Sequence, residues 1–209
     1  RTATPEAYLK SDLDELVYAV SEAWGQPCTN PDCADRSATF IDTQSHPFNL
    51  VGPKCDDIGM DCLADTQDAS YQFRPGHYFD DGQVWAVVGT LGTETGNATY
   101  VSLGLNQTYM RLGAKNVDGS ALEGSVSDFY GGRANSDKLY VYYFTRDCKG
   151  LEDLTHGFCM SVEATELVIP AGRAGTLVER DYMAVGTQRG PDSELTLPSR
   201  VLRLLVPAD

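Results

Sequence analysis

From Tyr71 onward the chain alternates between short segments rich in β-branched and aromatic residues and short groups of turn-forming residues. The segments that favour strands are 70–79, 83–91, 98–105, 107–112, 138–145, 158–163, 166–170 and 175–185. Turn-formers such as Asp80-Asp81-Gly82 and Asp118-Gly119 separate them. Many short strands at roughly ten-residue intervals are typical of an antiparallel sandwich or a jelly roll. The sequence therefore predicts a mainly β domain over residues 71–209.

Two of these regions carry further detail. In 138–145, aromatic and aliphatic side chains fall on both faces, so we expect this strand to be covered on each side. The tail from Leu195 to Val206 fits two structures. Pro198 is suited to open a short helix, whereas Val201, Arg203 and Leu205 alternate with leucines as in a closing strand.

Residues 1–25 predict one amphipathic helix. Thr4 is suited to the N-cap, Pro5 to the first helical position, and Glu6 to the positive end of the helix dipole. Apolar residues then recur at helical spacing, namely Leu9, Leu13, Leu16, Val17, Val20 and Trp24, and Gly25 and Pro27 end the helix. We expect this apolar stripe to pack against its own domain.

Residues 26–70 lack periodicity, apart from a short strand predicted at 38–42. The chain has six cysteines in three local pairs: Cys28 with Cys33, Cys55 with Cys62, and Cys148 with Cys159. None of these spacings is that of a zinc finger, so disulfides are favoured over zinc. An irregular stretch buries too little apolar area to repay its ordering entropy, so we expect disulfides to stabilise 26–70.

Two N-glycosylation sequons begin at Asn97 and Asn106. Together with the paired cysteines they favour a secreted or cell-surface glycoprotein. Because Arg1 is not a start methionine, we interpret the chain as a mature form whose leader has been removed.

The chain holds 16 Lys and Arg against 30 Asp and Glu, a formal net charge of −14. A surface of this sign repels phosphates, which argues against nucleic-acid binding. No stretch approaches ~18 consecutive apolar residues, so the sequence predicts no membrane span.

We assign no catalytic residue from the sequence. The three histidines, His46, His77 and His156, belong to no recognisable catalytic motif. The glycine-rich run from Gly89 to Gly96 lacks the Lys-Ser/Thr of a phosphate-binding loop, and strand-like segments flank it, so we expect a β-turn there. These observations favour a protein without catalytic activity.

Two features suggest binding. Carboxylates gather at Asp56, Asp57, Asp61, Asp65 and Asp68, where oxygen ligands would suit a weak Ca²⁺ site; the alternative, which we favour, is a solvated acidic loop without a cofactor. Aromatic residues such as Tyr71 and Tyr100 either fill the core, as most rings do, or stay exposed to stack on sugars or partner proteins.

Some segments resemble a known family. The runs Asp68-Ala69-Ser70-Tyr71, Val84-Trp85-Ala86-Val87-Val88-Gly89 and Ala98-Thr99-Tyr100-Val101-Ser102, and later Leu177-Val178-Glu179-Arg180-Asp181-Tyr182, are similar to motifs of the domain of unknown function 1214 family. The resemblance covers about residues 56–205. It implies a β-rich, jelly-roll-like domain and no established activity or catalytic residues.

Three functions remain open. The first is an extracellular structural or recognition protein, which would either self-assemble into a surface layer or fibre, or bind an extracellular glycan or protein. The second is a secreted hydrolase or lyase acting on a polysaccharide or a small ligand, with His77 or His156 beside a desolvated carboxylate. The third is a Ca²⁺-dependent carbohydrate-binding module.

Overall fold

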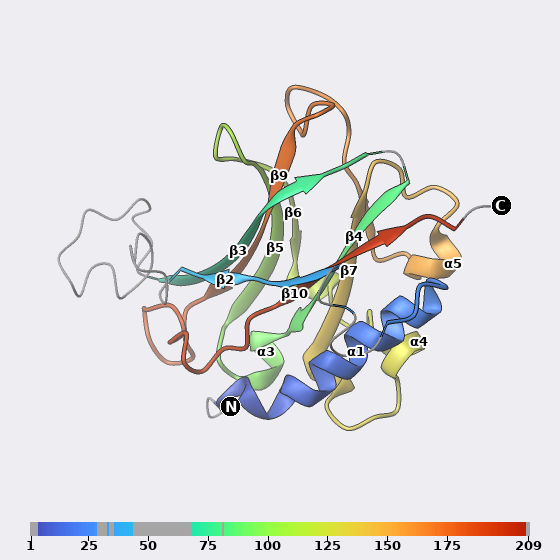
Figure 1. Ribbon diagram of the computed structural model, residues 1–209. Coiled ribbons are helices and arrows are strands. Elements are labelled where there is room, and N and C mark those ends of the chain that lie inside the picture. Colours follow the sequence, from blue (N-terminus) through green and yellow to red (C-terminus); the bar gives the residue numbers. More distant parts are fainter. Residues whose placement is uncertain (1–3, 29–32, 34–35, 44–67, 81, 208–209) are drawn as a thin grey trace.

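The computed structural model describes residues 4–28, 33, 36–43, 68–80 and 82–207. Within these ranges two five-stranded sheets pack face to face, as Figure 1 shows. Sheet A has the order β1 (Ser37–Thr39), β10 (Arg200–Leu205), β4 (Gln83–Thr90), β7 (Leu139–Thr145) and β8 (Cys159–Ser161). Sheet B has the order β2 (Ile41–Asp42), β3 (Ala69–Tyr78), β9 (Ala174–Tyr182), β5 (Tyr100–Gln107) and β6 (Leu112–Asp118). All pairings are antiparallel except that of β7 with β8, so the predicted sandwich is confirmed.

The amino-terminal helix covers the outer face of sheet A. A 3₁₀ turn (η1, Glu6–Leu9) leads into α1 (Lys10–Ala23), which crosses β4 and β10 (Figure 1). Its stripe from Leu13 to Trp24 is buried against alternate residues of β4, β7 and β10, as predicted. The Trp24 ring centroid lies 5.5 Å from that of Tyr143 on β7.

Both faces of β7 are buried, which confirms the prediction for 138–145. Leu139, Val141 and Tyr143 face α1, whereas Tyr140, Tyr142 and Phe144 face sheet B. The space between the sheets is filled by these rings together with aliphatic residues of β5 and β9 such as Leu103 and Leu177.

Four local predictions need correction. Residues 107–112 turn rather than extend, with Arg111 at φ 55°, and the strand β6 begins only at Leu112. Residues 166–170 form no strand, although Ile169 is buried in the core. The glycine-rich run contains one helical turn, α3 (Gly92–Thr95), which ends at left-handed Gly96 instead of forming a β-turn. The carboxyl-terminal tail is the strand β10, so its helical alternative is wrong.

The remaining short helical turns lie in connections. They are η3 (Gly119–Ala121), α4 (Ser127–Tyr130), η4 (Ser136–Lys138) and α5 (Glu152–Thr155).

Two of the three predicted disulfides lie in the described residues. Cys28 bonds Cys33 and Cys148 bonds Cys159, with Cα atoms 5.3 and 5.9 Å apart. Cys55 and Cys62 lie outside the described residues. The predicted strand at 38–42 is two strands, because the chain passes from sheet A to sheet B at Phe40.

Glu6 lies in the first helical turn, as the sequence predicts, but it is held there by hydrogen bonds from other segments of the chain. The N-cap residue of the first turn is Pro5 rather than Thr4, and no side chain makes a capping hydrogen bond there. Glu6 is buried, and its carboxylate accepts hydrogen bonds from the Thr90 and Thr95 hydroxyls at 2.7 and 2.6 Å. The Asn97 side-chain amide and the Leu197 N–H donate two more, at 3.0 and 2.9 Å. A buried carboxylate with four hydrogen-bond donors is well satisfied. These hydrogen bonds tie the amino end of the chain to the connection between β4 and β5 and to the segment before β10.

Two further acids, Glu179 and Asp181, point from β9 into the space between the sheets. The Tyr140 and Ser199 hydroxyls both donate to Glu179. Burial raises the pKa of Glu179 to about 7, the nearby charge of Glu6 adds to that increase, and the two hydroxyls oppose it. Burial likewise raises the pKa of Asp181 well above its usual value. A side chain at Gly89 would overlap Tyr140 and Ser199, so a glycine keeps space for this cluster.

Trp24→Ala tests the packing of α1. We expect it to cost about 3–5 kcal/mol of unfolding free energy, because it removes a fully buried ring from the layer between α1 and β7. Chemical denaturation measures the loss. The exposed helix residue Glu22 is the control, and Glu22→Ala should change stability by less than about 0.5 kcal/mol. A near-neutral Trp24→Ala would contradict the packing of α1.

Glu179→Gln tests the buried acid. A carboxyl whose pKa is raised by folding holds its proton in the folded state while the unfolded chain releases it, so stability is greatest below the unfolded pKa of about 4.5. Stability should then fall by up to roughly 3 kcal/mol as the pH rises from about 4.5 to 7. In Glu179→Gln the thermal midpoint should vary less over this range, whereas exposed Glu123→Gln should behave as wild type. An unchanged pH slope in Glu179→Gln would contradict the assignment.

Candidate functional site

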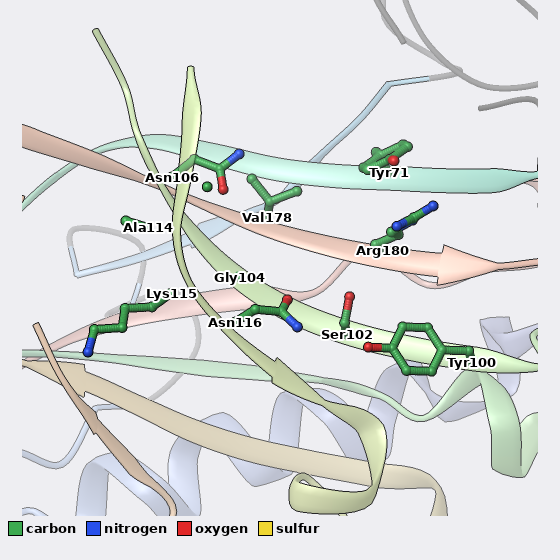
Figure 2. Close-up of a pocket in the computed structure, with 11 residues that line it drawn as sticks. Tyr71, Tyr100, Ser102, Gly104, Asn106, Ala114, Lys115, Asn116, Val178 and Arg180 are labelled. Carbon is green, nitrogen blue, oxygen red and sulfur yellow. The ribbon is translucent and has the colours of Figure 1, made fainter. Parts of the chain in front are cut away.

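The outer face of sheet B, opposite to the core, carries a hollow of about 440 Å³. Strand side chains alternate between faces, so the inward packing of Val101, Leu103 and Leu105 leaves Tyr100, Ser102, Gly104 and Asn106 of β5 on the outer face. The strands β3, β9 and β6 contribute the other side chains of the hollow (Figure 2).

One end of the hollow is aromatic and cationic. Tyr71, Arg180 and Ser102 lie side by side on β3, β9 and β5, because Arg180 pairs with both of the others across the sheet. Figure 2 shows Tyr100 at this same end. The Arg180 guanidinium lies 5.6 Å from the Tyr71 ring centroid and 4.8 Å from that of Tyr182, which holds it between the rings.

The rest of the hollow is lined by amides. Asn106 lies there, and Asn116 lies on β6 opposite Gly104, which forms the floor (Figure 2). A Cβ on Gly104 would come within 3.4 Å of the Asn116 side-chain oxygen, so the glycine keeps the hollow open. Lys115 also lines it and forms an ion pair with Glu163 at 2.8 Å.

This arrangement suits a ligand with apolar faces and many hydroxyls. Exposed tyrosine rings stack on the C–H faces of sugars, and Tyr100 is 39 % exposed. Asparagine amides offer both donors and acceptors to hydroxyl groups, and Arg180 offers donors. The described residues that line the hollow include no carboxylate, although the chain has a net charge of −14.

The two sequon asparagines lie in different environments. Asn106 is half-buried at the edge of the hollow. Asn97 is 1 % exposed, and its side-chain nitrogen donates to the Thr4 carbonyl at 2.9 Å as well as to Glu6. Because an N-glycan is attached through that nitrogen, this packing leaves no place for a sugar on Asn97. We therefore narrow the predicted glycosylation to Asn106.

The candidate histidines do not adjoin the buried acids. His156 is partly exposed, 3.1 Å from Asp128 and edge-on to the Phe129 ring. His77 is buried beside Trp85, with ring centroids 4.4 Å apart. His46 lies outside the described residues.

Only one of the five aspartates of the predicted Ca²⁺ site is described. Asp68 lies 4.0 Å from Arg180 in an ion pair. Asp56, Asp57, Asp61 and Asp65 lie outside the described residues. In the described ranges no group of three or more potential ligands is placed to hold a metal ion, and Ca²⁺ binding stays a prediction.

Sequence reasoning singled out Tyr71, Tyr100 and Asn106 but missed Ser102, Gly104, Asn116 and Arg180. The signal on β5 was present, since polar or small residues alternate there with aliphatic ones. The neighbours on β9 and β6 depend on strand order, which the sequence does not reveal.

A comparison with protein-family models finds no match to this chain, and a comparison with curated proteins finds none either. The resemblance to the domain of unknown function 1214 family stays a prediction. In the described part of the chain, no helix is both long and apolar enough to cross a membrane.

Glycan mass tests the two sequons separately. In protein secreted from a eukaryotic host, Asn106→Gln should remove all N-glycan mass, because Asn106 is the accessible acceptor. Thr99→Ala destroys the Asn97 sequon without altering Asn97, and it should leave the intact mass unchanged apart from the substitution. Loss of glycan mass in Thr99→Ala would contradict the assignment.

Proposed function

We propose that this protein is an extracellular recognition protein that binds an oligosaccharide in the hollow on the outer face of sheet B. The observation that carries the proposal is the juxtaposition of exposed Tyr100 and half-buried Tyr71 and Arg180 with two asparagine amides over a glycine floor. Ring stacking would supply the apolar contact, and the amides and guanidinium would read hydroxyl positions.

The extracellular assignment rests on covalent chemistry. The disulfides Cys28–Cys33 and Cys148–Cys159 persist in oxidising compartments, where an N-glycan on Asn106 would also be added. The strong net negative charge is compatible with a protein that stays soluble outside the cell.

The glycan proposed on Asn106 bears directly on this site. Asn106 lies six residues along β5 from Tyr100, roughly 20 Å away at the rise of an extended strand. A sugar on Asn106 would therefore start at the far end of the same hollow. We expect it to shorten the accessible part of the hollow and leave the tyrosine end open.

Self-assembly into a layer or fibre is a second proposal for the same chain. Strands β6 and β8 end sheets B and A, and an exposed edge can pair with an edge of another copy. A hydrolase or lyase activity has less support, because the buried acids Glu179 and Asp181 contact neither described histidine and face the closed interior.

The experiment is a binding screen against a panel of soluble extracellular polysaccharides, followed by calorimetry with oligosaccharides of those that bind. Tyr100→Ala and Tyr71→Ala should each weaken binding about tenfold, because each removes one stacking surface worth about 1–1.5 kcal/mol. The thermal midpoint of Tyr100→Ala should stay close to that of wild type, because Tyr100 is exposed.

Tyr8→Ala is the matched control, since Tyr8 is 45 % exposed on the first turn before α1, away from sheet B. It should bind as wild type. The same titrations with Thr108→Ala, which destroys the Asn106 sequon but keeps the Asn106 amide, and with EDTA separate the effects of the attached glycan and of Ca²⁺. Absence of binding across the panel in both wild type and Thr108→Ala, or equal affinity of Tyr100→Ala and wild type, would contradict the proposal.

A particle that elutes as a large assembly at high concentration would instead support self-assembly.

A further inference from the structure

A second hollow, of about 290 Å³, lies where the strands of sheet A approach the bulged end of β3. Strands β1, β10 and β4 contribute Ala38, Val201 and Trp85, which pack against the core between the sheets. The chain just before β1 contributes Arg36, and the opposite wall is the segment from Arg74 to His77, where the β3–β9 register shifts. None of these residues lines the hollow on the outer face of sheet B that contains Tyr71 and Tyr100, called the tyrosine hollow below, so the two sites are separate.

Three arginines converge on this hollow from three different segments: Arg36, Arg203 and Arg74. Arg36 and Arg203 lie opposite each other, because the Arg203 N–H donates to the Arg36 carbonyl at 2.8 Å. Like charges placed directly opposite on neighbouring strands repel each other. Three of the 16 basic residues of an acidic chain therefore surround one small space.

Within the described ranges, no carboxylate forms an ion pair with any of the three arginines. Arg36 is held in place because its side chain donates to the Gln26 and Pro27 carbonyls, at 3.0 and 3.4 Å. A guanidinium has five N–H donors, so Arg36 keeps others for a ligand. The positive charge of the hollow is thus not balanced by neighbouring described side chains.

His77 provides an independent observation. It is 4 % exposed, lines the hollow, and neither ring nitrogen has a hydrogen-bond partner of good geometry, although the Arg74 backbone lies close. A buried polar nitrogen without a partner destabilises the fold, and a bound ion is one of the groups that can satisfy it. Burial, with a further contribution from the charge of Arg74, lowers the pKa of His77 to about 4. The imidazole is therefore neutral near pH 7 and has one N–H to donate.

We propose that this hollow binds a tetrahedral oxyanion, a phosphate or sulfate group, through Arg36, Arg74, Arg203 and the His77 N–H. Three guanidinium groups from separate segments match an anion with several oxygens and two negative charges better than a carboxylate, whose two oxygens satisfy one arginine fork. The group arrives either as the free ion or as a substituent on an extracellular sugar.

The test is calorimetry and thermal denaturation of the full chain with sodium phosphate and sodium sulfate at pH 7, against sodium chloride at equal ionic strength. Both oxyanions should raise the thermal midpoint and give saturable heats, whereas chloride should not. A sulfated oligosaccharide and its unsulfated counterpart form the second arm. Tighter binding of the sulfated sugar than of both free sulfate and the unsulfated sugar identifies a sugar substituent as the source. A sulfated sugar that binds no more tightly than its unsulfated counterpart identifies the free ion.

Arg203→Gln and Arg74→Gln should each weaken phosphate binding at least tenfold, since each removes a charge-assisted contact. Arg203 is exposed on its strand, so its replacement should leave the fold intact. His77→Phe keeps a ring against Trp85, and should weaken binding while raising the thermal midpoint without anion, because it removes the unpartnered nitrogens. Arg133→Gln, a charge-matched change beside α1, should bind as wild type.

The proposal is overturned if wild type shows no saturable phosphate or sulfate binding, or if Arg203→Gln and Arg133→Gln bind equally. Tighter binding of galacturonate than of phosphate would also overturn it, in favour of a carboxylate site. The free-ion measurements and the Arg36, Arg74, Arg203 and His77 contacts do not involve the hollow on the outer face of sheet B, so their failure leaves the proposed oligosaccharide site untouched.

Discussion

The structure depends on how buried carboxyl groups are accommodated between the two sheets and at the connections that join them. Glu6, Glu179 and Asp181 are all buried, and an acid taken out of water must either find donors or keep its proton. Glu6 takes the first course, with four donors from segments 84 to 191 residues away in the chain. Glu179 combines the two, because two hydroxyls donate to it while burial raises its pKa, and burial also raises the pKa of Asp181.

This interior arrangement also places the residues of the outer face. Because successive side chains of a strand point to opposite faces, directing Glu179 and Asp181 inward places Val178 and Arg180 outward. A slip of one residue would expose the acids and bury Arg180, so the register of β9 is strongly specified. The hydrogen bonds of Glu179 with Tyr140 and Ser199 thereby support the position of Arg180 between Tyr71 and Tyr182. With the interior filled, the two hollows that suit ligands lie on the outside of sheet B and beside the bulge of β3.

Much of the fold follows from local pattern. The sequence predicts three features correctly, because each depends on residues close together in the chain: the apolar stripe of the helix, the burial of both faces of β7, and two local cysteine pairs. The role of Glu6 could not be predicted, because a charged residue in a first helical turn has the same local pattern whether it is solvated or buried. The sequence predicted a strand too early, at 107–112, because these residues have a strand-like composition. They form the turn at which the chain reverses direction between β5 and β6.

The candidate sites could be predicted only in part, because they bring together residues that are far apart in the chain. Alternation identifies which residues of one strand share a face, but β9 enters sheet B between β3 and β5 although it follows both by about 70 residues or more. Arg180 therefore reaches Tyr71 through strand order alone. The arginines beside His77 come together in the same way, from segments near residues 36, 74 and 203.

The most direct test of the central claim, that recognition occurs on the outer face of sheet B, is a titration of isotope-labelled protein with a binding oligosaccharide, followed by amide chemical shifts. The largest shifts should occur at Tyr71, Tyr100, Ser102 and Arg180, and the amides of α1 should stay unchanged. Shifts concentrated on α1, or on the interior residues around Glu179 and Tyr140, would contradict it.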